Sequence, residues 1–325
     1  MRLFILTEAG KNIGLGHLSR CSALYEEAIS RSIETQLLLY GDYVDSGIFS
    51  EISINYVNWM QVDFLIDLLN SNDYVIVDSY LANLEVLETI SVKSRNVIFL
   101  DDYNRIEYPR GLVISPNIFK SIASSNTIGG EEFVIIRKEM YKNHNMNPDS
   151  AINNILIMIG GTDYHYLGKD ISSSICKSVS NSHITLIANY GIDFECKKIN
   201  HIKNILPPVE LSKIMSNADL AIVQVSQVAY ELIHLNIPFI GIVTASNQEK
   251  LASFLEKIGV KIIHTNSINS VNYQRIINDA SSNNYRQNLI KTFNSFRFNG
   301  KRRIIDIVEN DYRSEEQNEF EIIQS

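Results

Sequence analysis

The sequence has no pair of cysteines at a metal-binding or redox spacing. Its three cysteines, Cys21, Cys176 and Cys196, are far apart in a chain of 325 residues, and no C-x-x-C motif occurs. We therefore expect reduced thiols and no structural zinc. Cys21 falls on the apolar stripe of a predicted helix, where a thiol acts as a small core residue.

Positive charge and long apolar runs are also scarce. The chain has 29 Lys and Arg against 37 Asp and Glu, a formal net charge of -8, which argues against a general nucleic-acid binder. No apolar run reaches the length of a membrane span, and no basic segment followed by an apolar one opens the chain. We expect a cytoplasmic protein, and the 45% hydrophobic and 20% charged content is typical of a soluble enzyme.

Short apolar runs alternate with helical patterns, which predicts an α/β fold with parallel sheets. The predicted strands are Arg2–Ala9, Glu34–Tyr40, Asn55–Trp59, Asp73–Tyr80, Asn96–Leu100, Leu112–Ser115, Glu132–Arg137, Ile152–Ile159, His183–Asn189, Asp219–Val225 and Ile237–Thr244. The predicted helices between them are Leu18–Ser32, Gln61–Leu69, Leu84–Ile90, Tyr164–Val179, Val209–Ser216, Val228–Leu235 and Lys250–Ile258.

A polar stretch over Lys138–Asn153 divides this pattern into two halves and reads as a linker. We expect two Rossmann-like domains, residues 1–140 and 151–300, which face each other across a cleft as in the GT-B architecture. Beyond Asn266 the pattern is helical, at Val271–Ala280, Tyr285–Phe296 and Arg302–Val308. The acidic tail within residues 301–325 is expected to be a frayed helix or disordered.

The first strand-to-helix connection contains Gly14-Leu15-Gly16-His17. Glycines without a Cβ let backbone amides approach an anion, and the helix dipole adds positive charge there. The segment is neither a Walker loop nor a dinucleotide fingerprint, because Ser19 occupies the place of the third glycine. We interpret His17 as the chemical centre, against the alternative that the glycines only form a turn and His17 is a surface or capping residue.

Two later strands of the first half end in polar residues, Asp78-Ser79-Tyr80 and Asp101-Asp102-Tyr103. The carboxyl ends of parallel strands share one edge of a sheet, so these groups are expected near His17. The alternative for each aspartate is a cap of the turn or helix that follows.

The second half repeats the arrangement with Gly160-Gly161-Thr162-Asp163 after its first strand. Backbone amides at such a loop suit a diphosphate, and Ser226 and Gln227 open another helix that offers the same. Glu231, within that helix, can accept hydrogen bonds from a ribose diol. Considered alone, Glu231 reads as a solvated helix residue.

These segments resemble one known family. The stretch Gly14–Cys21, Asp78-Ser79-Tyr80, Asp101-Asp102, Gly160-Gly161-Thr162-Asp163, Ser226 with Tyr230-Glu231-Leu232, and Asn247-Gln248 occur in the order found in the UDP-2,4-diacetamido-2,4,6-trideoxy-β-L-altropyranose hydrolases. These enzymes act in pseudaminic acid biosynthesis, which serves surface polysaccharide and flagellin glycosylation, and are related to a GT-B N-acetylglucosaminyltransferase. The resemblance covers about residues 1 to 260.

The resemblance implies a role for each matching residue. His17 matches the catalytic histidine that activates water, and Tyr80 and Asn247 match active-site positions around the sugar. The implied nucleotide-binding residues are Gly16, Gly160, Gly161, Thr162, Ser226, Gln227 and Glu231. The implied substrate pocket comprises Gly14, Arg20, Asp78, Asp102 and Gln248.

The implied reaction is hydrolysis of the anomeric C–O bond of a UDP-linked deoxy amino-sugar, without a metal or cofactor. A neutral imidazole can accept a proton from water, and a diphosphate leaves as a stabilised anion, so paired carboxylates are not required. The chain differs from the family in its longer C-terminal region and in Ser79, where a histidine is expected. The identity of the sugar therefore stays open.

Two other functions stay open at this stage. The first is a GT-B glycosyltransferase that uses a UDP-amino-sugar donor, with His17 deprotonating an acceptor hydroxyl. The second is a nucleotide-sugar binding or scaffold protein without turnover. The expected partner in all three is a UDP-sugar, and the sequence leaves the oligomeric state undetermined.

Overall fold

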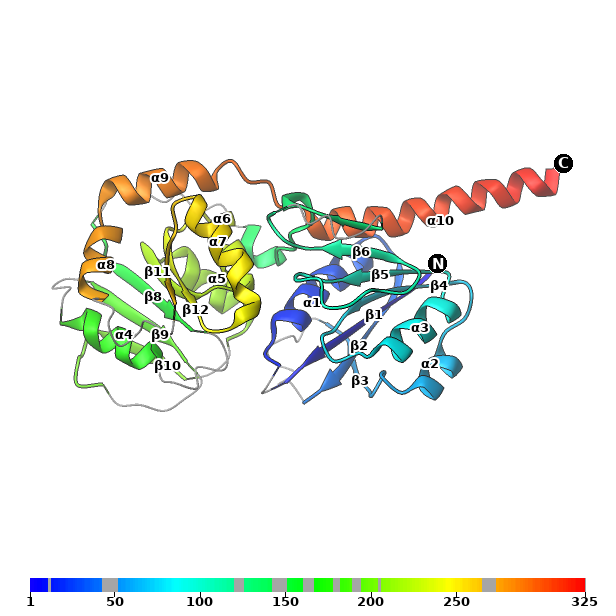
Figure 1. Ribbon diagram of the computed structural model, residues 1–325, viewed down its shortest axis with the longest axis horizontal. Coiled ribbons are helices and arrows are strands. Elements are labelled where there is room, and N and C mark those ends of the chain that lie inside the picture. Colours follow the sequence, from blue (N-terminus) through cyan, green and yellow to red (C-terminus); the bar gives the residue numbers. More distant parts are fainter. Residues whose placement is uncertain are drawn as a thin grey trace. The chain divides into compact units, whose positions relative to one another are not determined.

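The computed structural model describes residues 1–10, 13–42, 52–119, 126–141, 151–159, 167–177, 182–188, 194–203, 206–264 and 273–324. The chain divides into two units. The N-terminal unit contains Met1–Val44, Ser50–Arg137 and Arg297–Ser325, and the C-terminal unit contains Asp45–Phe49 and Lys138–Phe296. Each unit is an α/β structure with its own sheet (Figure 1).

The N-terminal unit has a parallel sheet in the order β3-β2-β1-β4-β5-β6-β7. Its strands are β1 (Arg2–Ala9), β2 (Glu34–Gly41), β3 (Ile54–Tyr56), β4 (Asp73–Asp78), β5 (Asn96–Leu100), β6 (Leu112–Ser115) and β7 (Thr127–Gly129). Its helices are α1 (Gly16–Ser30), α2 (Val62–Leu68), α3 (Leu84–Lys93) and α10 (Gly300–Gln324), with the short 3₁₀ helix η1 (Glu131–Phe133). The chain leaves β1 toward β2 on one side, and β4 lies on the other side, so the strand order reverses between β1 and β4.

The first strand is buried on both faces because Leu3 to Leu6 is an unbroken apolar run. Phe4 and Leu6 point to one face, where they cluster with residues of α2 and α3 such as Leu65 and Val86. Helix α1 contacts β1 and β2. This central strand delivers its last residues to the carboxyl edge of the sheet.

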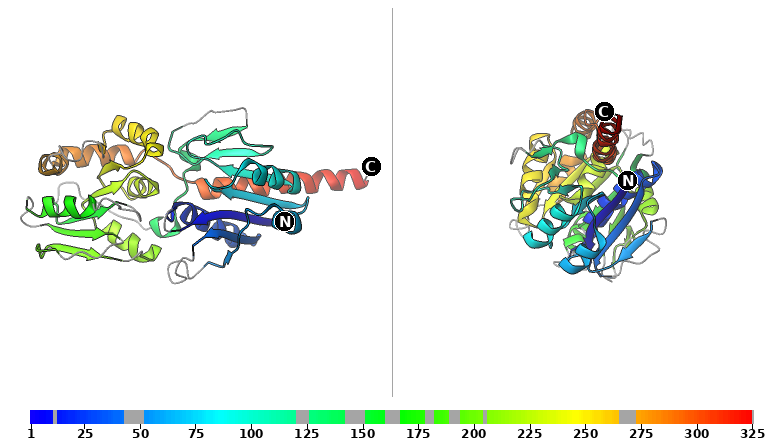
Figure 2. Two further views of the ribbon diagram at one scale, coloured as in Figure 1. Left: turned by 60° about the horizontal axis from the view of Figure 1, so that its bottom comes forward. Right: turned by 90° about the vertical axis from the view of Figure 1, so that its right-hand side faces the viewer.

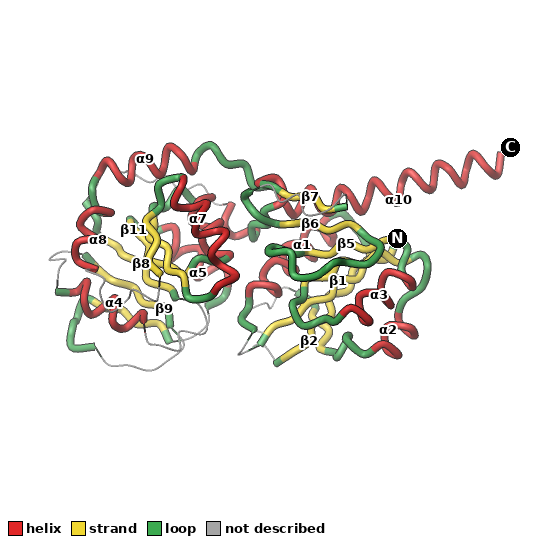
Figure 3. The backbone as a smooth tube through the Cα atoms, viewed as in Figure 1, coloured by secondary structure: helices red, strands yellow, loops and turns green. Residues whose placement is uncertain are grey.

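The C-terminal unit has a second parallel sheet in the order β10-β9-β8-β11-β12-β13. Its strands are β8 (Asn154–Met158), β9 (His183–Ile187), β10 (Ile199–Ile202), β11 (Leu220–Gln224), β12 (Phe239–Val243) and β13 (Lys261–His264). Its helices are α4 (Leu167–Cys176), α5 (Pro208–Ser216), α6 (Gln227–His234), α7 (Glu249–Lys257), α8 (Tyr273–Ala280) and α9 (Asn283–Phe293), with 3₁₀ helices η2 (Lys138–Tyr141) and η3 (Ser246–Gln248). Figure 3 shows the alternation of strands and helices in each unit.

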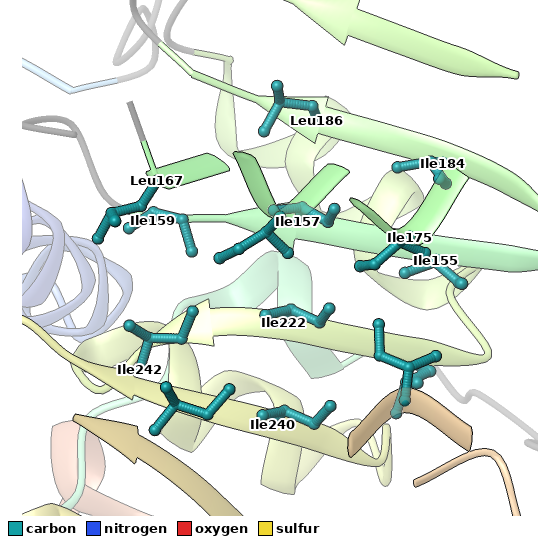
Figure 4. Packing of buried hydrophobic residues seen from close by; sticks show 14 of the residues in the cluster. Ile155, Ile157, Ile159, Leu167, Ile175, Ile184, Leu186, Ile222, Ile240 and Ile242 are labelled. Atoms are coloured by element: carbon teal, nitrogen blue, oxygen red, sulfur yellow. The ribbon is translucent and has the colours of Figure 1, made fainter. Parts of the chain in front are cut away.

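Isoleucine dominates the core of the C-terminal unit. Ile155 and Ile157 on β8 pack with Ile222 on β11 and Ile240 on β12, and Ile175 of α4 covers them (Figure 4). β-Branched side chains fit a pleated surface that is covered by helices, which explains this composition.

Helix α10 returns the chain to the N-terminal unit, where it packs on α1 (Figure 2). Arg31, just after α1, donates to Asp306 Oδ1 at 2.6 Å and to Glu309 Oε2 at 2.7 Å. The acidic tail, expected as a frayed helix or disordered, is part of α10.

Most predicted elements are confirmed within a few residues of their ends, but one predicted strand is wrong and three short strands were not predicted. Glu132–Arg137 is not a strand: Glu131–Phe133 is a 3₁₀ turn, and the strand is Thr127–Gly129. Gly130, with φ of 141°, turns the chain out of the sheet directly before it. The short strands Ile199–Ile202 and Lys261–His264 were not predicted either. These lie at the two sheet edges, where polar residues interrupt the apolar run.

The expectation of reduced thiols is wrong for two cysteines. The structure joins Cys176, at the end of α4, to Cys196, before β10, as a disulfide. Their separation of 20 residues carries no pairing signal in sequence, because the fold alone brings their Cα atoms to 6.6 Å. Cys21 is a buried free thiol, as expected for a core residue.

None of the helices that the structure describes is long and apolar enough to cross a membrane.

Candidate functional site

Polar residues gather at the carboxyl edge of the N-terminal sheet, around the point where the strand order reverses. β1 ends near Glu8, β4 ends at Asp78, and α1 begins at Gly16, one residue before His17. Open parallel sheets bind ligands at this kind of edge. The topology therefore brings residues from three separate segments of the chain to one place.

His17 is held by a buried carboxylate. Its Nδ1 lies 2.7 Å from Asp78 Oδ1. Arg20, one turn further along α1, donates to both oxygens of Asp78, with Nη2–Oδ1 at 2.8 Å and Nε–Oδ2 at 3.0 Å. His17, Arg20 and Asp78 are all buried. The structure therefore rejects the alternative that His17 is a surface residue, and Asp78 binds side chains of α1 rather than capping a helix.

The charge on Asp78 determines which ring nitrogen of a neutral His17 carries the proton. Burial disfavours the ionised form of Asp78, but Arg20 and His17 outweigh it and lower the pKa of Asp78 to about 2. Asp78 is therefore an ionised acceptor at neutral pH, and the short contact requires His17 to donate Nδ1–H. The neutral ring then carries its lone pair on Nε2.

Asp102 extends the hydrogen-bond network of His17, Asp78 and Arg20 to Tyr80. Arg20 Nη1 donates to Asp102 Oδ2 at 2.8 Å, and the Tyr80 hydroxyl donates to Asp102 Oδ1. Burial, and then the charge of Asp102, raise the pKa of Tyr80 well above its usual value, so this phenol keeps its proton. The Tyr80 ring meets the His17 ring edge to face, with centroids 4.3 Å apart.

The capping alternative holds for Asp101. Its carboxylate accepts from the backbone amides of Tyr103, Asn104 and Arg105 at 2.7 to 3.0 Å. Asp101 therefore shapes the loop after β5, whereas Asp102 pairs with Arg20.

Glu8 also belongs to this network, although its sequence pattern did not predict it as a site residue. This glutamate is fully buried and accepts from the Ser79 hydroxyl and from the amides of Tyr80 and Leu81. Its Oε1 lies 3.9 Å from His17 Nε2. The available signal was an acid at the end of the apolar run Leu3 to Leu6, where a charge is costly unless it has partners.

The two glycines play different parts. Gly14 has φ of 83°, a left-handed conformation that favours glycine, and its amide donates to Gly10 O at 2.7 Å. Gly16 is exposed and is the first residue of α1. Helix α1 has no side-chain cap at Leu15 and no acid in its first turn. Its first amides can therefore face an anion.

In the C-terminal unit, three residues expected to bind nucleotide lie on or next to α6. Ser226 precedes the helix and Gln227 begins it, both half-buried. Glu231 is 1% exposed, so the reading of it as a solvated residue is wrong. Gly160, Gly161 and Thr162 lie outside the described residues. The strand order of this sheet reverses between β8 and β11, the strand that leads to Ser226.

Asn247 and Gln248 lie in η3, after β12. The side chain of Asn247 is exposed. Gln248 Oε1 accepts from the amide of Thr244 at 2.8 Å and from that of Ala245 at 3.3 Å. Gln248 therefore shapes the loop at the end of β12.

Metal ligands do not cluster in the described ranges: no group of three or more His, Cys, Asp and Glu is placed there to hold an ion.

Two parallel α/β units, each with a reversal in strand order, define a GT-B fold, and solved structures agree with this assignment. MurG of Acinetobacter baumannii superposes with a TM-score of 0.65 at 12% identity, covering 95% of this chain and 99% of that one. The spinosyn forosaminyltransferase SpnP superposes with a TM-score of 0.65 at 8% identity, covering 95% of this chain and 98% of that one. The glycosyltransferase SnogD from Streptomyces nogalater superposes with a TM-score of 0.59 at 11% identity, covering 94% of this chain and 99% of that one.

Sequence comparison gives a narrower result. The chain is 21% identical over 280 residues to the UDP-2,4-diacetamido-2,4,6-trideoxy-beta-L-altropyranose hydrolase of Campylobacter jejuni, covering 81% of this chain and 98% of that protein. It is 21% identical over 270 residues to a Helicobacter pylori protein named as a pseudaminic acid cytidylyltransferase and the same hydrolase, covering 80% of this chain and 48% of that protein. No family model matches. The motif resemblance is thus confirmed, and the chain is a distant relative of these hydrolases.

Proposed function

We propose that this protein hydrolyses the anomeric C–O bond of a UDP-linked deoxy amino-sugar, releasing UDP and the free sugar in the cytoplasm, in a pathway like that of pseudaminic acid. The observation that carries the proposal is the 2.7 Å contact between His17 Nδ1 and ionised Asp78. This contact makes Nε2 the proton acceptor, which is the tautomer that a water-activating base requires. The names of the two relatives support the substrate class.

The proposed reaction is a single displacement. His17 Nε2 takes a proton from water while the water oxygen attacks the anomeric carbon, and the C–O bond breaks with its electron pair leaving on the diphosphate. Asp78 stabilises the imidazolium that forms, and Tyr80 orders the histidine ring through their edge contact. The start of α1, which has no side-chain cap, favours negative charge on the departing group.

We assign the nucleotide to the C-terminal unit. Ser226 and Gln227 offer the start of α6 to the diphosphate, and Glu231 serves the ribose. Gly160, Gly161 and Thr162 complete this assignment on the motif resemblance, and Asn247 is assigned to the sugar on the same ground. The sugar stays undefined, because Ser79 replaces the histidine expected there and donates to Glu8 instead.

The test is UDP release from a panel of UDP-linked amino-sugars in water, with no acceptor present. We expect turnover by the wild type and a loss of at least about 10³-fold in His17→Ala, with UDP binding retained by calorimetry. His183→Ala, an exposed histidine at the start of β9, is the matched control and should keep wild-type turnover. Equal rates in the wild type and His17→Ala would exclude His17 as the base.

The second candidate is a glycosyltransferase, favoured by the glycosyltransferases among the structural neighbours. It uses the same base to deprotonate an acceptor hydroxyl. UDP binding without release until a sugar or lipid acceptor is added would select this function over hydrolysis.

A further inference from the structure

The hydrogen bonds that Glu8 accepts from the chain leave one acceptor position of its carboxylate unused. An ionised carboxylate offers about four acceptor positions, two on each oxygen. Oε2 accepts from the Ser79 hydroxyl and from Leu81 N, whereas Oε1 accepts from Tyr80 N at 2.8 Å. One acceptor position is therefore left, and it belongs to the oxygen nearer to His17.

Near Oε1 lies His17 Nε2, which carries a lone pair when Nδ1–H donates to Asp78. The Nε2–Oε1 distance is 3.9 Å, too long for a direct hydrogen bond. Within the described residues Nε2 makes no hydrogen bond. When His17 is neutral and donates Nδ1–H to Asp78, Nε2 is an acceptor, as is Glu8 Oε1. The two atoms therefore cannot hydrogen-bond to each other, and each requires a donor.

One water molecule can donate a hydrogen bond to both atoms. A water oxygen about 2.8 Å from each of two acceptors 3.9 Å apart would subtend an angle of about 90° between them, near the angle between the two O–H bonds of water. Such a water donates one proton to each acceptor, which leaves the lone pairs of its oxygen directed away from both.

We infer that Glu8 is a second acceptor that, together with His17, holds and orients the attacking water. This inference rests on the proposed hydrolysis. In the reaction, one water proton passes to Nε2 as the oxygen bonds to the anomeric carbon, and the C–O bond electrons leave on the diphosphate. The other proton stays on the new sugar hydroxyl, hydrogen-bonded to Glu8 Oε1. Glu8 therefore orients the nucleophile without itself taking a proton.

Two variants separate this role from a structural one. Glu8→Gln keeps the shape and one acceptor oxygen but removes the charge and half of the acceptor positions. Glu27→Gln makes the same charge change outside the site, where Glu27 Oε1 accepts from Arg31 Nη2 at 2.7 Å. We expect Glu8→Gln to lower kcat by about 10²-fold with KM within about threefold of wild type. Glu27→Gln should lower the melting temperature but reduce kcat by less than about threefold.

A crystal structure of the wild type supplies a readout that does not depend on turnover. We expect an ordered water within hydrogen-bond distance of both Nε2 and Oε1, lost or displaced in Glu8→Gln. A direct Nε2–Oε1 hydrogen bond without a water would overturn the inference even if Glu8→Gln failed to fold. So would full activity in folded Glu8→Gln, or an equal loss of kcat in Glu27→Gln. A bridging water in a protein that releases no UDP would keep the water site and reject the proposed hydrolysis.

Discussion

The ionised state of Asp78 is a property of single residues with a consequence for stability. Its pKa of about 2 in the folded protein lies below the ordinary value of 3.8. Because the folded-state pKa is the lower one, ionised Asp78 contributes about 2 kcal/mol to the free energy of unfolding above pH 4. This contribution is lost as the pH falls toward 2 and the carboxylate is protonated. The carboxylate that holds His17 thus also contributes to stability in acid.

The prediction is tested with Asp78→Asn. At pH 7 this variant should be less stable than the wild type by at least about 2 kcal/mol, since Arg20 and His17 lose a buried anion. The difference should stay constant from pH 7 to 5 and narrow between pH 4 and 2, as measured by urea unfolding. Asp67→Asn, exposed at the end of α2, is the control and should give a small difference at every pH. A gap that widens in acid would contradict the depressed pKa.

Residue chemistry also decides how much of the site could be read from sequence. Gly14-Leu15-Gly16-His17 and Asp78 were found because glycines and acids at strand ends are local signals. Glu8 was missed because its significance depends on the loop after β4, 71 residues away along the chain. The separation of Asp101, a loop cap, from Asp102, an ion-pair partner, likewise depends on which oxygen faces which donor.

At the scale of elements, two helices begin with a glycine for opposite reasons. A Cβ at Gly16, the start of α1, would meet nothing within 4 Å. A Cβ at Gly300, the start of α10, would strike the backbone of η1, with Phe133 O in its path and Val134 C at 2.6 Å. Glycine is thus required at α10 by close packing, and at α1 it only leaves space.

Alanine at each position should therefore have effects of opposite sign. Gly16→Ala should leave the free energy of unfolding unchanged or raise it by up to about 1 kcal/mol, because alanine is the better helix former. Gly300→Ala should lower it by about 2 kcal/mol or more, since neither backbone can move without separating α10 from η1. Urea unfolding of the two variants side by side measures both values. Equal effects would show that α10 does not dock closely on η1.

The elements differ in how well sequence predicts them. Central strands such as β1 and β4 were predicted because burial on both faces makes them continuous apolar runs. The edge strands β10 and β13 were missed, because one side of an edge strand faces no neighbour and tolerates polar residues. The return of α10 to the N-terminal unit follows from contacts with α1 that no local pattern in either helix reveals.

At the scale of the whole molecule, the two units carry separate reporters of stability. Trp59 is the single tryptophan of the chain and is fully buried in the N-terminal unit, where its Nε1 donates to Thr7 O at 2.8 Å. The disulfide between Cys176 and Cys196 lies wholly in the C-terminal unit. Selective tryptophan fluorescence therefore follows one unit, while circular dichroism follows the helices of both.

Opening the disulfide should destabilise the C-terminal unit more than the N-terminal one. A crosslink that closes a loop of 20 residues restricts the unfolded chain and contributes about 3 kcal/mol. The double variant Cys176→Ser/Cys196→Ser should shift the main circular dichroism transition to lower temperature, and reductant should do the same to the wild type but not to the variant. The midpoint from Trp59 should shift less in both cases, because no covalent link in the N-terminal unit has changed. Identical shifts in the two signals would mean that the units unfold as one cooperative body, and that the disulfide stabilises the N-terminal unit together with the C-terminal one.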